Sequence, residues 1–287
     1  MKVIIRVSQG LANRMFQVAF ALSMREKYDV KVDCVRKIKF AHEDVDMFRI
    51  FRNLNIKEAS HREIKSLGGE DTFFYKVIRR LPFVSSTVIY PFDQPFMPHK
   101  LNIKHDSYFI GTFQSELFFA NVKDNVRKAF EFPKLEDEKN IAFAESLNAE
   151  NSVAIHVRKG NDYKKDILLN TCKVVYYMKA IQYIKDHVEN PRFYVFTDNQ
   201  QWVKDNFKDF EYKIVDWNPI TGSKSYIDMQ LMSFAKHNII ANSTFSWWGA
   251  WLNDNKDKIV IAPQHWYNPN MDNLQNLGIV PNNWIKI

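Results

Sequence analysis

The beginning of the chain alternates the pattern of a buried strand with that of a helix. Residues 2–7 are mostly apolar, which predicts a strand, and residues 12–28 carry apolar side chains at helical spacing. Residues 8–10, Ser-Gln-Gly, predict a turn between them, and residues 30–35 predict a second strand. The order of strand, glycine-containing turn, helix and strand is typical of the opening of a doubly wound α/β domain.

The following segments have a weaker pattern. We expect residues 40–82 to be helical, and residues 82–98, which are rich in proline, to form a loop with short strands. Residues 108–113 predict a strand and residues 117–130 a helix. Residues 133–151 are highly charged and then helical in pattern, and we place a domain boundary near their start.

The alternation of strands and helices restarts at residue 152. Strands are predicted at 152–157, 191–197, 212–215, 238–241 and 258–262, and helices at 173–188, 200–207, 226–236 and 246–252. Alternation on both sides of the boundary predicts an α/β fold of two Rossmann-like domains facing each other, residues 1–135 and 136–287.

The composition is that of an ordinary globular protein. Of the 287 residues, 46% are apolar and 25% charged, which excludes disordered and low-complexity classes. Two cysteines, Cys34 and Cys172, cannot form a disulfide framework and indicate a reducing compartment. The first apolar run is too short for a signal peptide. The charge-free stretch at 238–253 is too short to span a bilayer, so we expect no transmembrane segment.

Net charge and aromatic content leave the class of ligand open. The net charge is +7, a basic excess that suits a nucleotide, an acidic lipid surface or a nucleic acid. The charges are interleaved rather than clustered, which argues against a nucleic-acid-binding protein. Aromatic residues make up 15% of the chain, and we expect most of them in the core.

The turn at Gly10 is the first candidate for ligand binding. A glycine between a strand and a helix lets the backbone approach a ligand, and the N-terminus of the following helix favours an anion. A glycine in this position more often serves only the turn. Neither a dinucleotide fingerprint nor a P-loop is present in the sequence.

The second candidate follows the predicted strand at 152–157. Alternate residues of a strand share a face, so His156 and Arg158 point the same way at its carboxyl end, where ligands bind in open α/β sheets. Arg158 can offer a bidentate contact to a phosphate, and Lys159 and Gly160 add a cation and a tight turn. A solvated basic strand end is the alternative. We favour an anion site, because the basic residues lie between a buried strand and a glycine.

The third candidate surrounds the last predicted helix. Asp228 opens the helix before it, and Ser243, Thr244 and Ser246 supply hydroxyls at its N-terminus. Hydroxyls beside the N–H groups of a helix N-terminus can form a phosphate cradle. Plain N-capping is the alternative, and the sequence does not decide between the two. The tryptophans that follow are expected in the core: Trp247, Trp248 and Trp251.

Segments spread along the whole chain together resemble one family. They are GLANRMFQVAFAL at 10–22, GTFQSE at 111–116, HVRKGNDY at 156–163, FYVFTDN at 193–199, KHNIIANSTFSWWGAWLN at 236–253, APQHWYN at 262–268 and WIKI at 284–287. In this order and spacing they resemble the motifs of the bacterial α-1,2-fucosyltransferases of glycosyltransferase family 11.

The resemblance implies an activity, a fold and partners. It implies the glycosyltransferase B fold, with an acceptor-side first domain and a second domain that binds the GDP-sugar. The implied reaction is inverting transfer of L-fucose from GDP-β-L-fucose to the 2-hydroxyl of a galactose, with no metal cofactor. The implied partners are GDP-fucose and a galactose-terminated oligosaccharide or lipid-linked glycan, and no nucleic acid. The implied location is cytoplasmic, with peripheral contact at the inner face of the membrane left open.

The resemblance also implies roles for particular residues. Arg158 would stabilise the departing diphosphate, and Glu116 and Asp162 are the candidates for the general base. Gln114 and Ser115 would bind the acceptor. The implied donor-binding residues are Gly10, Asn13, Arg14, His156, Arg158, Lys159, Asp198, Asp228, Ser243, Thr244 and Ser246.

Some positions depart from the family pattern. The chain has Gln9, Ala12 and Arg14 where the family usually has Gly, Gly and Gln. Lys159 replaces a second arginine, and the insertion of Asn161 shifts the register of Asp162. These changes leave a related inverting glycosyltransferase with a different donor or linkage as the alternative.

Two further motifs have a structural interpretation that is simpler than a functional one. Asp44 and Asp46 match the Asp-x-Asp pattern of metal-dependent glycosyltransferases. They lie in a charged stretch rather than after a buried strand, so we expect no metal role. Residues 73–84 are basic and aromatic and could contact a membrane surface or an acidic substrate. A solvated helix with one core face is the simpler interpretation.

Overall fold

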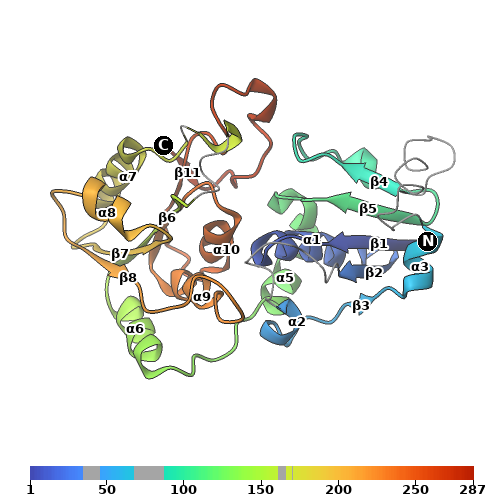
Figure 1. Ribbon diagram of the computed structural model, residues 1–287, viewed down its shortest axis with the longest axis horizontal. Coiled ribbons are helices and arrows are strands. Elements are labelled where there is room, and N and C mark those ends of the chain that lie inside the picture. Colours follow the sequence, from blue (N-terminus) through green and yellow to red (C-terminus); the bar gives the residue numbers. More distant parts are fainter. Residues whose placement is uncertain (35–45, 68–86, 161–165, 170) are drawn as a thin grey trace. The chain divides into compact units, whose positions relative to one another are not determined.

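The structure is a computed structural model that describes residues 1–34, 46–67, 87–160, 166–169 and 171–287 (Figure 1). The chain divides into two compact units. The first unit consists of Met1–Pro133 and the short segment Asn276–Ile279, and the second consists of Lys134–Gln275 and Val280–Ile287. The hydroxyl of Ser115 donates a hydrogen bond of 2.6 Å to the carbonyl of Gly278, which ties the short segment to the first unit.

The first unit contains a parallel sheet of five strands in the order β3-β2-β1-β5-β4. The central strand pairs with both neighbours, through Val7↔Cys34 on one side and Ile5↔Phe109 on the other. Its strands are β1 (Lys2–Val7), β2 (Asp29–Cys34), β3 (Lys57–Glu58), β4 (Thr87–Tyr90) and β5 (Ser107–Gly111).

Helix α1 is the main helix of the first unit and packs against β1 and β2 (Figure 1). It corresponds to the helix predicted at residues 12–28, but it ends at Met24. Its side chain Phe20 stacks on Phe113, with ring centroids 4.2 Å apart. The helices of this unit are α1 (Leu11–Met24), α2 (Met47–Ile50), α3 (His61–Ser66), η1 (Pro98–Leu101), η2 (Glu116–Val122) and α5 (Lys123–Ala129).

Two predictions for the first unit are wrong. The expected helix over 40–82 contains, in its described part, the strand β3 between the short helices α2 and α3. Strand β3 exists because Lys57 pairs with Lys31 of β2, a tertiary contact that local periodicity does not reveal. The expected helix over 117–130 is broken at Phe119, which has φ −137° and ψ 25°. The rings of Phe119 and Phe118 pack against α1, on Phe16 and Phe20 respectively, and these tertiary contacts are not visible in the local periodicity.

The second unit contains a parallel sheet of six strands in the order β11-β10-β9-β6-β7-β8. The strands β6 and β7 pair along their whole length, from Ser152↔Arg192 to Val157↔Thr197. Its strands are β6 (Ser152–Val157), β7 (Arg192–Thr197), β8 (Tyr212–Val215), β9 (His237–Ile239), β10 (Val260–Ala262) and β11 (Ile285–Lys286).

The helices of the second unit agree with the predicted ones to within a few residues. Helices α9 and α10 pack closely, since a Cβ atom at Gly249 would lie 3.0 Å from Cβ of Met232. Trp247, Trp248 and Trp251 are buried, which confirms them as core residues. The helices are α6 (Glu138–Ala149), η4 (Asp166–Leu168), α7 (Val174–His187), α8 (Gln200–Asn206), α9 (Ile227–Phe234), α10 (Thr244–Leu252) and η5 (Asp272–Leu274).

Both units are parallel sheets connected by helices, which confirms the predicted fold class of two Rossmann-like domains. Among the described residues, no helix has the length and apolar character that a bilayer span requires.

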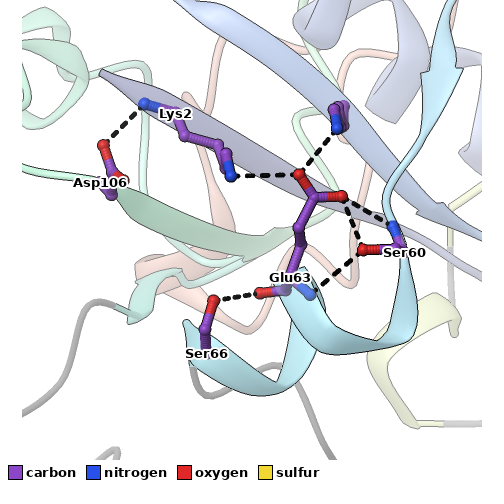
Figure 2. Close-up of polar contacts among 6 residues, drawn as sticks. Lys2, Ser60, Glu63, Ser66 and Asp106 are labelled. Carbon is purple, nitrogen blue, oxygen red and sulfur yellow. Dashed lines mark hydrogen bonds and ion pairs between the residues drawn. The ribbon is translucent and has the colours of Figure 1, made fainter.

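Glu63 joins α3 to the amino ends of two strands (Figure 2). Its Oε1 accepts from Nζ of Lys31 at 2.7 Å and of Lys2 at 3.1 Å. Its Oε2 accepts from the backbone N–H of Ser60 at 2.9 Å, within a capping box at the start of α3. The hydrogen bond from Lys31, with those from Ser60 and Lys2, holds the pKa of Glu63 well below its usual range. This cluster lies at the strand ends opposite to those where α/β sheets bind ligands, so we assign it to stability.

Candidate functional site

The basic turn, residues 158–160, follows β6 at its carboxyl end. Because Val157 pairs with Thr197, the next residues of the two strands, Arg158 and Asp198, lie side by side. Oδ2 of Asp198 lies 3.2 Å from Nε of Arg158. The same carboxylate accepts the backbone N–H of Lys159 at 2.7 Å and of Gly160 at 3.1 Å. Asp198, predicted to bind the donor, is therefore engaged with the backbone and side chain of the basic turn.

The side chain of Lys159 is directed into the protein. Its Nζ donates to the carbonyl of Cys172 at 2.6 Å and lies 4.8 Å from the ring centroid of Trp202. Burial lowers the pKa of Lys159. Lys159, which was predicted to bind the donor, thus connects the basic turn to Cys172 and Trp202.

Cys172 connects the basic turn to the loop before α10. Its thiol donates to Oδ1 of Asn242 and accepts the backbone N–H of Asn242, both at 3.3 Å. Burial raises the pKa of Cys172 to about 11, so the group remains a thiol at neutral pH. Asn242 also donates to the carbonyl of Trp266 at 2.9 Å. No pattern in the sequence assigns either residue to the site, and only the folded structure brings them together.

His156 is buried beside the N-terminus of α10. Its side chain is 6% exposed, and its ring centroid lies 5.9 Å from that of Phe245 in the first turn of α10. The hydroxyl of Tyr177 donates to its backbone carbonyl at 3.1 Å. Burial, with the charge of Arg158, lowers the pKa of His156 to about 3. Its Nδ1 has no hydrogen-bond partner among the described residues, so His156 is a neutral ring with an unused polar atom.

The N-terminus of α10 keeps its cap hydroxyl unused. Ser243 occupies the N-cap position, and its side chain makes no capping hydrogen bond. Ser243 and Thr244 are partly exposed, whereas Ser246 is fully buried. The hydroxyl of Ser246 is directed to the carbonyls of Ser243 at 3.3 Å and Ala241 at 3.5 Å. The two exposed hydroxyls thus lie where an anion could meet the helix N-terminus, and Ser246 supports the loop.

Asp228 lies in the first turn of α9 at the end of a chain of hydrogen bonds. Its Oδ1 accepts from Asn218 at 2.8 Å, Asn218 accepts from Asn140 at 2.9 Å, and Asn140 accepts from the indole of Trp217 at 2.9 Å. Burial raises the pKa of Asp228 to about 6. The other three residues were not predicted from the sequence. Trp217 and Asn218 follow the carboxyl end of β8, so the strand-end rule could have found those two.

In the first unit, the predicted donor-binding residues Asn13 and Arg14 and the predicted acceptor-binding residue Gln114 are connected by hydrogen bonds near the turn before α1. The amide of Asn13 donates to Oε1 of Gln9 at 2.7 Å and accepts from Gln114 at 2.8 Å. Nε of Arg14 donates to the carbonyl of Gln9 at 2.6 Å. Gln9 has φ 73°, a conformation that favours glycine, and glycine is the usual residue of the family pattern. The carboxamides of Gln9, Asn13 and Gln114 thus form one continuous chain.

Two further features support this turn. Gln17, which the sequence analysis gave no role, is buried and links two strand ends. It accepts from the backbone N–H of Ser8 at 2.8 Å and donates to the carbonyl of Gly111 at 2.9 Å. A polar residue in an otherwise apolar helix was the signal from which a role for Gln17 could have been predicted.

Gly10 has φ −67°, and no described atom lies within 4 Å of where its Cβ would be. Neither packing nor backbone conformation therefore requires glycine there.

Ser115 and Glu116 lie at the start of η2. Ser115 is buried, donates to Gly278 and caps η2 by accepting from the N–H of Leu117 at 3.3 Å. Its hydroxyl is therefore engaged within the protein, although it was predicted to bind the acceptor. Glu116 forms an ion pair of 2.8 Å with Lys123 through Oε2, and its role as general base remains a prediction.

Several predicted residues cannot be placed. Asp162, Asp44 and residues 73–84 lie outside the described residues. Asp46 is described, and its carboxylate caps α2 by accepting from the N–H of Phe48 at 3.1 Å. Within the described parts of the chain, no group of three or more His, Cys, Asp or Glu side chains is arranged to hold a metal ion. Independence from a metal remains a prediction.

Comparison with known proteins identifies the family. Residues 2–287 match the family described as Glycosyl transferase family 11. The chain is 31% identical to an alpha-1,2-colitosyltransferase of Escherichia coli, over 99% of this chain and 98% of that protein. It is 28% identical to the O-antigen biosynthesis glycosyltransferase WbnK of Escherichia coli, over 91% and 93%. The fucosyltransferase NodZ from Bradyrhizobium, a solved structure, has 15% identity and a TM-score of 0.49, over 86% of this chain and 92% of NodZ. The resemblance read from the motifs is thereby confirmed: the chain belongs to glycosyltransferase family 11.

Proposed function

We propose that this glycosyltransferase transfers L-fucose from GDP-β-L-fucose to the 2-hydroxyl of a galactose, with inversion at the anomeric carbon. The observation that carries the proposal is the arrangement at the end of β6. There Arg158 is held by Asp198, in the same unit as a helix N-terminus with a partly exposed hydroxyl pair. Such a cation and such N–H groups suit a diphosphate, and a nucleoside diphosphate is the leaving group of this reaction.

The second unit supplies the stabilisation of the leaving group. The acceptor O2 attacks C1 of fucose, the bond from C1 to the β-phosphate oxygen breaks, and GDP departs with the bonding electrons. Arg158 and the first turn of α10, which begins after Ser243, offset the charge that develops on the diphosphate. A charge-assisted hydrogen bond contributes roughly 1.5–3 kcal/mol. His156, neutral and buried, and Asp228, at the start of α9, serve the nucleotide by hydrogen bonding.

The first unit supplies polar groups suited to sugars. Carboxamides both donate and accept hydrogen bonds, as sugar hydroxyls do, and Asn13 and Gln114 present an ordered pair of them. Gly10 leaves open space that the donor can approach. The proton of the acceptor hydroxyl goes to a carboxylate, for which Glu116 and Asp162 are the candidates. The acceptor we propose is a galactose-terminated glycan of a surface polysaccharide or its lipid-linked precursor.

A second donor is favoured by one specific observation. The relative that is 31% identical over nearly the whole chain is an alpha-1,2-colitosyltransferase. Colitose is the 3-deoxy analogue of fucose, so the two donors differ by one hydroxyl. A site that hydrogen-bonds this hydroxyl rejects the analogue that lacks it by a large factor, whereas an apolar site discriminates weakly. The ratio of kcat/KM for the two GDP-sugars therefore separates the two candidate functions.

The test is GDP release from each GDP-sugar with a panel of β-galactosides, with and without EDTA. We expect acceptor-dependent release from GDP-fucose that survives EDTA. Release only from GDP-colitose would replace the proposed donor by the second candidate. Release abolished by EDTA would contradict metal independence and return attention to Asp44 and Asp46. Absence of release from either GDP-sugar with any galactoside would contradict the proposed function.

A further inference from the structure

Asp198 accepts three donors from three consecutive residues of the basic turn. They are Nε of Arg158 and the backbone N–H groups of Lys159 and Gly160. We propose that Asp198 is a positioning residue, which acts on the donor through Arg158 and does not bind it. The inference rests on the proposed function, in which Arg158 contacts the diphosphate, and it changes the role that the family resemblance implied for Asp198.

The geometry fixes the guanidinium as well as the turn. Contact at 3.2 Å through Nε sets the plane of the guanidinium, and with it the direction of the two terminal nitrogens of Arg158. The bonds to Lys159 and Gly160 fix the backbone that carries this side chain. The carboxylate of Asp198 thus fixes both the backbone next to Arg158 and the orientation of its guanidinium group.

The backbone that carries Asp198 is held by hydrogen bonds on both sides. The hydroxyl of Thr197 accepts the N–H of Asn199 at 3.0 Å, a bond that spans Asp198. Oδ1 of Asn199 accepts the N–H of Trp202 at 3.0 Å and so caps α8 directly after Asp198. Trp202 of α8 also lies under the ammonium of Lys159, which reaches back from the basic turn. The turn is therefore fixed on two sides by residues that follow β7.

The packing leaves little freedom at this carboxylate. A Cβ atom at Gly160 would lie 2.6 Å from Oδ2 of Asp198, so any other residue there would displace the carboxylate. The three partners of Asp198 are all donors, which is the set that a carboxylate satisfies. An amide in its place turns an N–H group toward at least one of them. Asp198→Asn therefore removes the match with almost no change of size.

The charge of Asp198 gives different expectations for a residue that positions Arg158 and for a residue that binds the donor. Asp198→Asn removes a negative charge next to the proposed diphosphate site, which by itself does not weaken attraction for an anion. We expect GDP affinity to change less than threefold. Misplacement of the guanidinium acts on the transition state, where the leaving group gains charge, and a 1 Å displacement can cost about a hundredfold in rate. We therefore expect kcat to fall about a hundredfold with little change in the KM of the donor.

The experiment is a double-mutant cycle on the intact protein, with Asp198→Asn, Arg158→Lys and both changes together. It uses whichever GDP-sugar the wild type transfers, and GDP affinity is measured by calorimetry. If Asp198 acts through Arg158, its replacement costs little further kcat in the Arg158→Lys background. Equal losses in both backgrounds would overturn the proposal, as would an Asp198→Asn variant with kcat within threefold of the wild type.

Two further variants keep the test decisive. Gly160→Ala displaces the carboxylate without changing any charge, so it is expected to lower kcat even if Asp198→Asn fails to fold. Unchanged kcat in Gly160→Ala would overturn the proposal. Asp205→Asn, at an exposed position on α8, is the matched control for loss of charge and is expected to keep wild-type kinetics. A wild-type protein that does not bind GDP would instead contradict the proposed function.

Discussion

Replacement of Asp228 by asparagine is predicted to stabilise the protein and to impair its function. The carboxylate accepts one hydrogen bond from Asn218, and an amide oxygen can accept the same bond. Burial raises the pKa of Asp228 from 3.8 to about 6, because it disfavours the ionised form. The substitution removes this cost of ionisation. The folded protein binds this proton more tightly than the unfolded chain does, so the contribution of Asp228 to stability is present below pH 4 and is lost as the pH rises through 6.

The magnitude follows from the shift. A difference of about two pKa units corresponds to about 3 kcal/mol when the group is fully ionised in both states. Because the side chain of Asp228 keeps some contact with solvent, we expect about 1–2 kcal/mol at pH 8. In a domain of this size, each kcal/mol moves the thermal midpoint by about 2–4 °C. At pH 5 the gain is roughly half as large, because the unfolded chain is ionised there and the folded chain is not.

The assay is thermal denaturation of the wild type and Asp228→Asn at pH 5 and pH 8, followed by circular dichroism. Asp205→Asn serves as the control, because its exposed carboxylate has no burial cost to relieve. We expect a higher midpoint for Asp228→Asn at pH 8, a smaller gain at pH 5, and weaker GDP binding. A variant that is less stable than the wild type at pH 8 would refute the reasoning about burial.

Three other predictions follow from the described contacts. Arg158→Ala removes the cation of the basic turn and leaves Asp198 beside the diphosphate, so kcat/KM is expected to fall by about ten- to a hundredfold; near-normal turnover would remove the main site assignment. Gly10→Ala meets no described atom and no strained backbone, so we expect an unchanged melting curve with a raised donor KM, and an unchanged KM would show that no ligand approaches Gly10. Glu63→Gln leaves the ammonium groups of Lys2 and Lys31 without their carboxylate, and the lowered pKa of Glu63 means that its stabilisation is present above pH 5 and fades in acid. The variant should melt lower than the wild type at pH 7, the difference should shrink at low pH, and a loss of kcat per folded molecule would contradict a purely structural role.

The sequence predicts the fold best where strands are long and apolar. Strand β6 is found with its observed bounds, because its six residues are all buried and follow a charged helix. The two-residue strand β11 is not predicted, because its assignment depends on pairing of Ile285 with Ile261. The break at Phe119 is also not predicted by periodicity, since it accompanies the packing of Phe118 and Phe119 against α1, a tertiary contact.

Only those parts of the candidate site that depend on the order of strands and helices are predicted from the sequence. The strand-end rule points to His156 and Arg158 from sequence order alone. It does not show that Lys159 turns back toward Cys172 and Trp202, since that direction depends on the packing of α8. It also does not show that Ser115 bonds Gly278, a residue 163 positions away in the chain. Contacts of this kind exist only in the folded protein.

The central claim is the transfer of fucose to the 2-hydroxyl of galactose, and the structure of the product tests it most directly. The purified protein would be incubated with GDP-β-L-fucose and a β-galactoside, and the product examined by nuclear magnetic resonance. We predict a fucose in α linkage to O2 of galactose, with the anomeric configuration inverted relative to the donor. A β-linked product, or attachment at another hydroxyl, would contradict the proposed function.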